Sequence, residues 1–382
     1  MAFIGILCLI LLTTTLAAHF SRRIGIPAVV GQLIVGVVLG TGGLNLVHAD
    51  VLVHEFSEIG VILLMFLAGL ESDLGLLKKY LKPSLLVAVF GVIFPILMGW
   101  GTGAAFQVPF KEALFFGIIL AATSVSISVE VLKELRVVNT KEGSTILGAS
   151  VVDDILIVLV ISLSMTFFTG ETTSETPFAL TFIEQILYFV LIFFLIKWVA
   201  PYLMKLAEQL FAQSAVIIVS LVICLSMSVL ADVVGLSSVI GAFFAGIAVS
   251  QTKVKHEVFK NVEALGYSVF IPVFFVSVGL EVTFGHFLEQ LLFIVLFTLV
   301  AVVSKLAGGY LGSKGVGFSN HSAWMVGAGM VSRGEMALII LQIGQQAGLI
   351  QAEYYSPLVI TILLSTLISP LALKYFTKKV HG

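Results

Sequence analysis

The sequence carries little charge: only 11% of its 382 residues are Asp, Glu, Lys or Arg. Soluble domains typically contain about 25% charged residues. The hydrophobic fraction is 59% and the mean hydropathy is +1.14. Apolar runs of about 20 residues, the length at which a helix crosses a bilayer, recur from one end of the chain to the other. The composition therefore predicts an all-α, multi-pass membrane protein that contacts the lipid bilayer.

Cysteine and histidine are also scarce. Cys8 and Cys224 lie inside apolar runs, so we expect them to serve in packing. The seven histidines are scattered without the spacing of metal ligands, and we expect no zinc or haem site. A formal net charge of −2 gives no indication of nucleic-acid binding. The loops between apolar runs are short, so we expect no nucleotide-binding domain, no cofactor and no ATP-driven transport.

The first apolar run is expected to stay in the membrane. No basic residue precedes it, whereas Arg22 and Arg23 follow it, which is the reverse of the order in a signal peptide. Hydropathy and helix breakers divide the whole chain into thirteen expected spans: 2–20, 26–44, 55–72, 83–106, 112–132, 143–168, 181–206, 214–234, 236–252, 264–282, 286–312, 321–348 and 355–376.

Basic residues alternate between the two sides of these spans. All but three of the 20 Lys and Arg residues fall at one set of alternate loops or in the C-terminal tail. The exceptions are Lys111, in an opposite loop, and Lys305 and Arg333, which lie within spans. The positive-inside rule then predicts an N-terminus outside the cell and a cytoplasmic C-terminus.

Two segments of the chain resemble each other at a fixed offset. Residues 26–37, "IPAVVGQLIVGV", align with 236–247, "LSSVIGAFFAGI", and the same offset of 210 places "GLE" at 69–71 on "GLE" at 279–281. This pattern predicts a duplication, with repeats at 1–180 and 211–382 and a linker helix at 181–210. An odd number of linking spans inverts the second copy, as in secondary transporters that work by alternating access. The alternative is that such glycine spacing reflects ordinary helix packing.

Polar residues interrupt two spans at matching positions. "TSVSIS" at 123–128 aligns with "RGEMAL" at 333–338 at the same offset. Such interruptions predict two discontinuous helices that cross near the middle of the membrane. Their free carbonyls and helix ends would lie beside a cation site, with Thr123 and Ser124 near the cation and with Arg333 and Glu335 stabilising the crossing. Continuous helices whose hydroxyls bond to their own backbone are the alternative.

Two adjacent carboxylates, Asp153 and Asp154, lie in the apolar run "GASVVDDILIVLVI" at 148–161. A charge at the bilayer centre costs at least ~2.5–3.5 kcal/mol, so each must be protonated, paired or bound to a cation. Neighbouring side chains on a helix point about 100° apart, so the two can serve different partners. Lys305, in "AVVSKLAGG" at 301–309, can pair with one of them. It could instead extend towards the cytoplasmic interface.

These residues suggest exchange by competition. A carboxylate among neutral dipoles binds either a proton or a small cation, and a site that crosses the membrane only when neutralised exchanges one for the other. The alternative is that the aspartates belong to a purely structural polar network.

The motifs "VVDDILIVL", "AATSVSIS", "SKLAGG" and "GMVSRGEMALII" resemble those of the bacterial monovalent cation:proton antiporters of the second group, most closely the NapA-type Na⁺/H⁺ antiporters. The resemblance implies an NhaA/NapA-like fold in a bacterial plasma membrane. Asp154 would carry Na⁺ or H⁺, with Asp153 beside it in exchange with Lys305. Thr123 and Ser124 would supply oxygens from the broken helix.

The same resemblance implies a homodimer and a core domain at 83–168 and 286–376 that moves against a dimerisation domain. A lysine at the position of Lys305 goes with electrogenic exchange. Related K⁺ efflux systems have Gln–Asp where this chain has Asp153–Asp154, which favours Na⁺ and Li⁺ without excluding a K⁺/H⁺ antiporter.

Three other functions are compatible with parts of the pattern. A Na⁺-coupled symporter of an organic anion would need a free intramembrane cation, for which only Arg333 is available. A channel is less compatible, because buried carboxylates with a compensating lysine suit a site that closes around its ion better than an open pore. An intramembrane aspartyl protease also uses two aspartates, but on separate helices that face each other, whereas Asp153 and Asp154 are adjacent.

Overall fold

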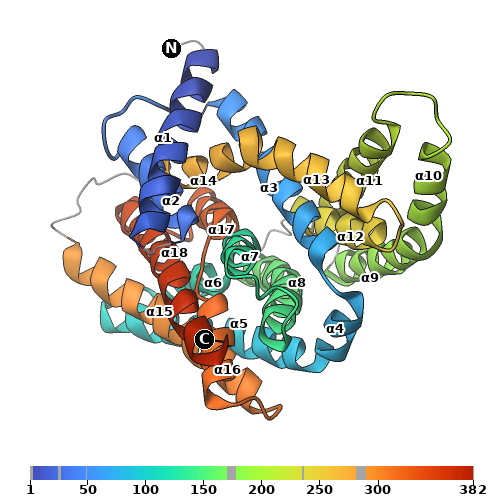
Figure 1. Ribbon diagram of the computed structural model, residues 1–382. Helices are drawn as coiled ribbons and strands as arrows, with labels where there is room; N and C mark the ends of the chain where they lie inside the picture. Colours follow the sequence, from blue (N-terminus) through green and yellow to red (C-terminus); the bar gives the residue numbers. More distant parts are fainter. Residues whose placement is uncertain are drawn as a thin grey trace.

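The computed structural model describes residues 3–24, 27–48, 50–169, 178–234, 236–280 and 290–381. In this part of the chain the regular structure is entirely helical. The elements, shown in Figure 1, are α1 (Phe3–Arg23), α2 (Ala28–Leu39), α3 (Val51–Glu71), α4 (Leu74–Lys79), α5 (Leu81–Ala105), α6 (Phe110–Ala121), α7 (Val125–Glu134), α8 (Lys141–Thr169), α9 (Phe178–Phe194), the π-helical turn η1 (Leu195–Val199), α10 (Ala200–Ala207), α11 (Ala215–Val233), α12 (Ser238–Ser250), α13 (Lys255–Leu265), the π-helical turn η2 (Gly266–Phe270), α14 (Ile271–Leu280), α15 (Leu291–Lys314), α16 (Asn320–Gly329), α17 (Glu335–Gln346) and α18 (Ala352–His381).

Ten helical stretches of the described chain are long and apolar enough to cross a membrane. The multi-pass helical fold expected from composition is therefore confirmed, but by this criterion the spans are fewer than thirteen. The difference arises because α2 and α12, with 12 and 13 residues, and the half-helices α16 and α17 are short. Parts of the expected spans at 264–282 and 286–312 lie outside the described residues, at 281–289.

The short helices α2 and α12 are held by close backbone contacts. A β-carbon added at Gly36 of α2 would lie 2.8 Å from the Cα of Gly279 in α14. Likewise, one added at Gly246 of α12 would lie 2.8 Å from the Cα of Gly69 in α3. Only glycine allows the two backbones to approach this closely. These two contacts join α2 to α14 and α3 to α12.

A second pair of close contacts joins α5 to α6 and α15 to α16. A β-carbon at Gly99 of α5 would lie 2.5 Å from the Cα of Gly117 in α6, and one at Gly309 of α15 would lie 2.6 Å from the Cα of Gly327 in α16. Figure 1 shows α9 to α12 on one side of the view and α5, α15 and α16 on the other, with α7 and α8 between them. The residues that could bind an ion therefore lie in the middle of the bundle.

Two predicted spans are broken where the sequence analysis expected. The chain leaves helical geometry between α6 and α7, at 122–124, and again between α16 and α17, at 330–334. The alternative of continuous helices at these positions is therefore wrong.

Candidate functional site

The two adjacent aspartates lie about midway along α8 and face different surroundings. Asp153 is completely buried, and Asp154 is 4% exposed. Asp154 is thirteen residues from the start of α8, about 20 Å along the helix axis. The rotation between neighbouring helical positions sends Asp153 towards α15 and Asp154 towards the break between α6 and α7.

Lys305 of α15 contacts Asp153 directly. Its Nζ donates a hydrogen bond of 3.0 Å to Oδ2, and both side chains are completely buried. The side chain therefore does not extend to the interface. The second oxygen, Oδ1, has no hydrogen-bond partner among the described residues. Gly91 of α5 leaves space beside this pair, since a β-carbon there would lie 3.6 Å from Nζ and 3.9 Å from Oδ1.

The two helix breaks cross and hydrogen-bond to each other. The backbone N–H of Ser124 donates to the Ser332 carbonyl at 2.8 Å, and the Ser332 hydroxyl donates to the Ser124 carbonyl at 2.9 Å. The hydroxyls of Ser128 and Ser332 lie 2.8 Å apart. Backbone groups that would be unsatisfied in an apolar environment are paired in this way. The sequence analysis missed Ser332, although it directly precedes Arg333.

Arg333 is completely buried and uses its guanidinium to bind backbone carbonyls. Nε and Nη2 donate to the Leu120 carbonyl at 2.9 and 2.7 Å. Nη2 also donates to the Ala301 carbonyl at 2.7 Å, and Nη1 donates to the Val331 carbonyl at 3.0 Å. Leu120 is in the last turn of α6, where carbonyls lack helical partners and the helix dipole favours a cation. The side chain of Glu335 lies outside the described residues.

Asp154 lines a small cavity at the crossing. The cavity has a volume of about 20 Å³, which is enough for one water molecule or a dehydrated cation. Oxygen atoms dominate its polar lining, which suits a hard cation. The residues that line it are Thr123, Ser124, Val125, Ser126, Asp154, Ser237, Val239 and Met336.

The cavity joins parts of the chain that are far apart in sequence. Thr123 lies beside Asp153, and its hydroxyl has no hydrogen-bond partner among the described residues. Ser237 caps α12 by accepting a hydrogen bond of 3.3 Å from the Val239 backbone. The sequence analysis missed both Ser237 and Val239, since neither interrupts an apolar run. Asp154 therefore faces α12 across the cavity, whereas Asp153 faces away from it.

The chain is similar to known proteins over nearly its whole length. The chain is 72% identical to a Na⁺/H⁺ antiporter of Enterococcus hirae, over the full length of both. It is 42% identical to the Na⁺/H⁺-K⁺ antiporter GerN of Bacillus cereus, over 97% of this chain and 95% of the relative. The sodium proton antiporter MjNhaP1 of Methanocaldococcus jannaschii shares its fold, with a TM-score of 0.66 at 18% identity over 99% of each chain. Residues 8–379 match the family described as "Sodium/hydrogen exchanger, transmembrane". The chain therefore belongs to the sodium/hydrogen exchanger family.

Proposed function

We propose that this protein exchanges Na⁺ for H⁺ across a bacterial plasma membrane by alternating access, without an enzymatic step. The observation that carries the proposal is the position of Asp154, a nearly buried carboxylate on a cavity that holds one small particle. A proton and a dehydrated Na⁺ cannot both neutralise that carboxylate in so small a space. Binding of one therefore releases the other.

The choice of cation rests on the relatives. The Enterococcus hirae relative is named for Na⁺ and H⁺, and we expect Li⁺, a hard ion of similar chemistry, to be carried as well. The name of GerN also includes K⁺, so K⁺/H⁺ exchange is the second candidate function. Selectivity depends on the size of the cavity and on the placement of its oxygens.

The pair of Lys305 and Asp153 supports electrogenic exchange. Its ion pair lies in the same group of helices as Asp154 but faces away from the cavity. When cation binding at Asp154 is coupled to opening of this pair, Asp153 and Lys305 can each change their proton occupancy. We propose that Asp154, Thr123 and Ser124 bind the cation in the cavity and that Asp153 joins them when its pair with Lys305 opens. Arg333 and Glu335 would stabilise the crossing.

Close glycine contacts support two inverted repeats in a thirteen-span fold. Gly36 contacts Gly279, and Gly246 contacts Gly69. The offset of 210 relates the two contacts, because it takes Gly36 to Gly246 and Gly69 to Gly279. The contacts of Gly99 with Gly117 and of Gly309 with Gly327 are related by the same offset. We assign the repeats to 1–180 and 211–382, joined by a linker helix at 181–210.

Within these repeats, we propose a moving core at 83–168 and 286–376 and a scaffold formed by the rest of the chain. The scaffold would contain the contact of a homodimer. Large apolar side chains exposed between the start of α9 and the end of α11, including Phe193 of α9 and Trp198 of η1, would face lipid or the second copy. The distribution of Lys and Arg supports a cytoplasmic C-terminus.

The bonding of Arg333 argues against a symporter of organic anions. Its Nε, Nη1 and Nη2 all donate to backbone carbonyls, so it is committed to the crossing. The paired Lys305 is equally committed to Asp153.

The proposed function is tested in everted vesicles energised by respiration, with a dye that reports the pH gradient. Wild type should dequench the dye on addition of NaCl or LiCl, and Asp154→Asn should not. Asp232→Asn, the same substitution at an exposed aspartate of α11, is the control and should behave as wild type. A response to KCl alone would establish the K⁺/H⁺ function instead. No response to any of the three cations would contradict both.

A further inference from the structure

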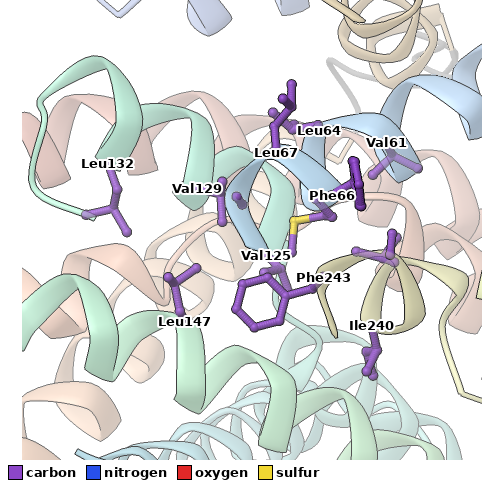
Figure 2. Close-up of a cluster of buried hydrophobic side chains, with 14 of the residues drawn as sticks. Val61, Leu64, Phe66, Leu67, Val125, Val129, Leu132, Leu147, Ile240 and Phe243 are labelled. Atoms are coloured by element: carbon purple, nitrogen blue, oxygen red, sulfur yellow. The ribbon is translucent and has the colours of Figure 1, made fainter. Parts of the chain in front are cut away.

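The half-helix α7 forms the boundary between the proposed core and scaffold. It begins at the break beside the Asp154 cavity, and by the basic-residue distribution it runs from there towards the cytoplasm. One face of α7, together with Leu147 of α8, packs against apolar side chains of α3 and α12 (Figure 2). The buried cluster that spans this boundary contains Val125, Val129, Leu132 and Leu147 on the core side, and Val61, Leu64, Phe66, Leu67, Ile240 and Phe243 on the scaffold side.

Apolar contacts of this kind are not directional. They keep water out of the route along α7, but they do not fix one position of α7 relative to α3 and α12. Directional bonds lie farther along the same half-helix, at its cytoplasmic end.

Glu130 makes the most buried of these bonds. The residue is 6% exposed, and its Oε2 accepts a hydrogen bond from the hydroxyl of Tyr267. Tyr267 lies in η2, a π-helical turn between α13 and α14 of the scaffold. Such turns often occur at functional sites, because the extra residue redirects the side chains around it. The hydrogen bond therefore crosses from core to scaffold.

Lys133, three residues farther along, also reaches the scaffold. Its Nζ lies 3.5 Å from Glu71 Oε2, at the end of α3. The same ammonium lies 5.3 Å from the ring centroid of Tyr267 and 5.4 Å from that of Phe259 in α13. This arrangement combines an ion pair with two cation–π contacts.

Glu134, the last residue of α7, binds the first two helices. Its Oε2 accepts a hydrogen bond of 3.0 Å from the backbone N–H of Ala28, the first residue of α2. Its Oε1 lies 3.7 Å from Arg22 Nε of α1, but the Arg22 side chain is 65% exposed, so this pair contributes little. One end of α7 is therefore bonded to α1, α2, α3 and η2.

We propose that Glu130, Lys133 and Glu134 form a cytoplasmic latch that closes the route between Asp154 and the cytoplasm. Glu130 is a positioning residue: it does not bind the transported ion, but its bond to Tyr267 sets how often the core opens towards the cytoplasm. This inference rests on the alternating access proposed above. It assigns a role to a buried carboxylate outside the cation site and to a tyrosine on the opposite domain.

The latch is tested by the accessibility of a cysteine in the cavity, which requires no transport. Cys8→Ser and Cys224→Ala remove the native thiols, and Ser126→Cys places one on the lining of the cavity. A membrane-impermeant maleimide is added to everted vesicles, where it reaches the cytoplasmic face. Tyr267→Phe removes the donor of the bond and should speed labelling about fivefold, the change produced by losing one hydrogen bond. Glu130→Gln keeps an oxygen that can accept but removes the charge, which weakens the bond, so it should speed labelling by a smaller factor.

Three comparisons separate the latch from general loosening. The double variant Glu130→Gln with Tyr267→Phe should label no faster than Tyr267→Phe alone, because once the hydroxyl is gone there is no bond left for Glu130→Gln to weaken. Labelling of right-side-out vesicles should not increase. Glu112→Gln is the matched control, because Glu112 is also buried but its two oxygens accept bonds from Gln351 within the proposed core.

Unchanged labelling in both single variants would overturn the latch, as would equal acceleration by Glu112→Gln or faster labelling from both faces. The dye assay on the wild type is independent of this result. If the cysteine variants label as expected but the wild type exchanges no cation, the latch is supported and the proposed function is contradicted.

Discussion

Replacing Lys305 with glutamine removes a positive charge from a site that water does not reach. Asp153 then loses the hydrogen bond of 3.0 Å to its Oδ2, while its Oδ1 already has no hydrogen-bond partner among the described residues. Gly91 provides no side chain that could replace the ammonium. The carboxylate must therefore stay charged and unpaired or bind a proton.

Both outcomes have a comparable cost. Removing one partner of a buried ion pair costs ~3–5 kcal/mol. Protonating a carboxyl of ordinary pKa at pH 7 costs ~4 kcal/mol. We therefore expect Lys305→Gln to lose ~3–4 kcal/mol of stability, because the protein adopts whichever outcome costs less. Adding Asp153→Asn removes the second charge as well, and the double variant should regain most of this loss.

Thermal unfolding in detergent compares the wild type, Lys305→Gln, and the double variant with Asp153→Asn. The single variant should unfold several degrees below the other two. In liposomes, exchange by Lys305→Gln should no longer respond to an imposed membrane potential. The reasoning is refuted if the single variant is as stable as the wild type, if the double variant is no better than the single, or if the voltage dependence is unchanged.

Other substitutions test the crossing and the glycine contacts. Arg333→Lys replaces the three guanidinium nitrogens, which bond the Leu120, Ala301 and Val331 carbonyls, by one nitrogen, and each buried group left unpaired costs ~1–3 kcal/mol, so purified protein should unfold at a lower temperature. Ser332→Ala removes the hydroxyl bond to the opposite break and should raise the Na⁺ concentration for half-maximal dequenching, whereas an unchanged value would show that the break is rigid without it. Gly99→Ala should cost ~1–3 kcal/mol by overpacking, because its β-carbon would lie 2.5 Å from a backbone atom. Gly91→Ala is the matched control, with its nearest contact at 3.6 Å, and its yield and thermal stability should equal those of the wild type.

The main site could be anticipated because buried polar groups must be satisfied. Lys305 and Asp153 lie in apolar runs, and a buried charge without a partner is so unfavourable that their contact follows from chemistry. The breaks near Ser124 and Arg333 follow similarly, since polar residues at membrane depth are tolerated where the backbone is discontinuous.

Other contacts depend on tertiary structure that has no local signature. Val239 lines the cavity although it lies in an ordinary apolar run. Glu130 lies near a predicted helix end, where a charged residue is unremarkable, and only the fold brings Tyr267 to it. The sequence offset identified Gly36 and Gly246 as equivalent positions. It did not reveal that both are contact points between helices, Gly36 with Gly279 and Gly246 with Gly69. Periodicity also contains no sign of the π-helical turn that holds Tyr267.

The glycine contacts also determine where the molecule can deform. At Gly36 with Gly279 and at Gly69 with Gly246, backbone meets backbone, so no side chain is available to change rotamer when one helix slides along the other. If one helix slid along the other by a single residue, about 1.5 Å, a larger side chain next to the glycine would be pressed against the backbone of the partner helix. The helices α2, α3, α12 and α14 therefore behave mechanically as two fused pairs. Sliding is confined to surfaces lined by Val, Leu and Phe side chains, such as the one between α7 and α3, where rotamers can adjust (Figure 2).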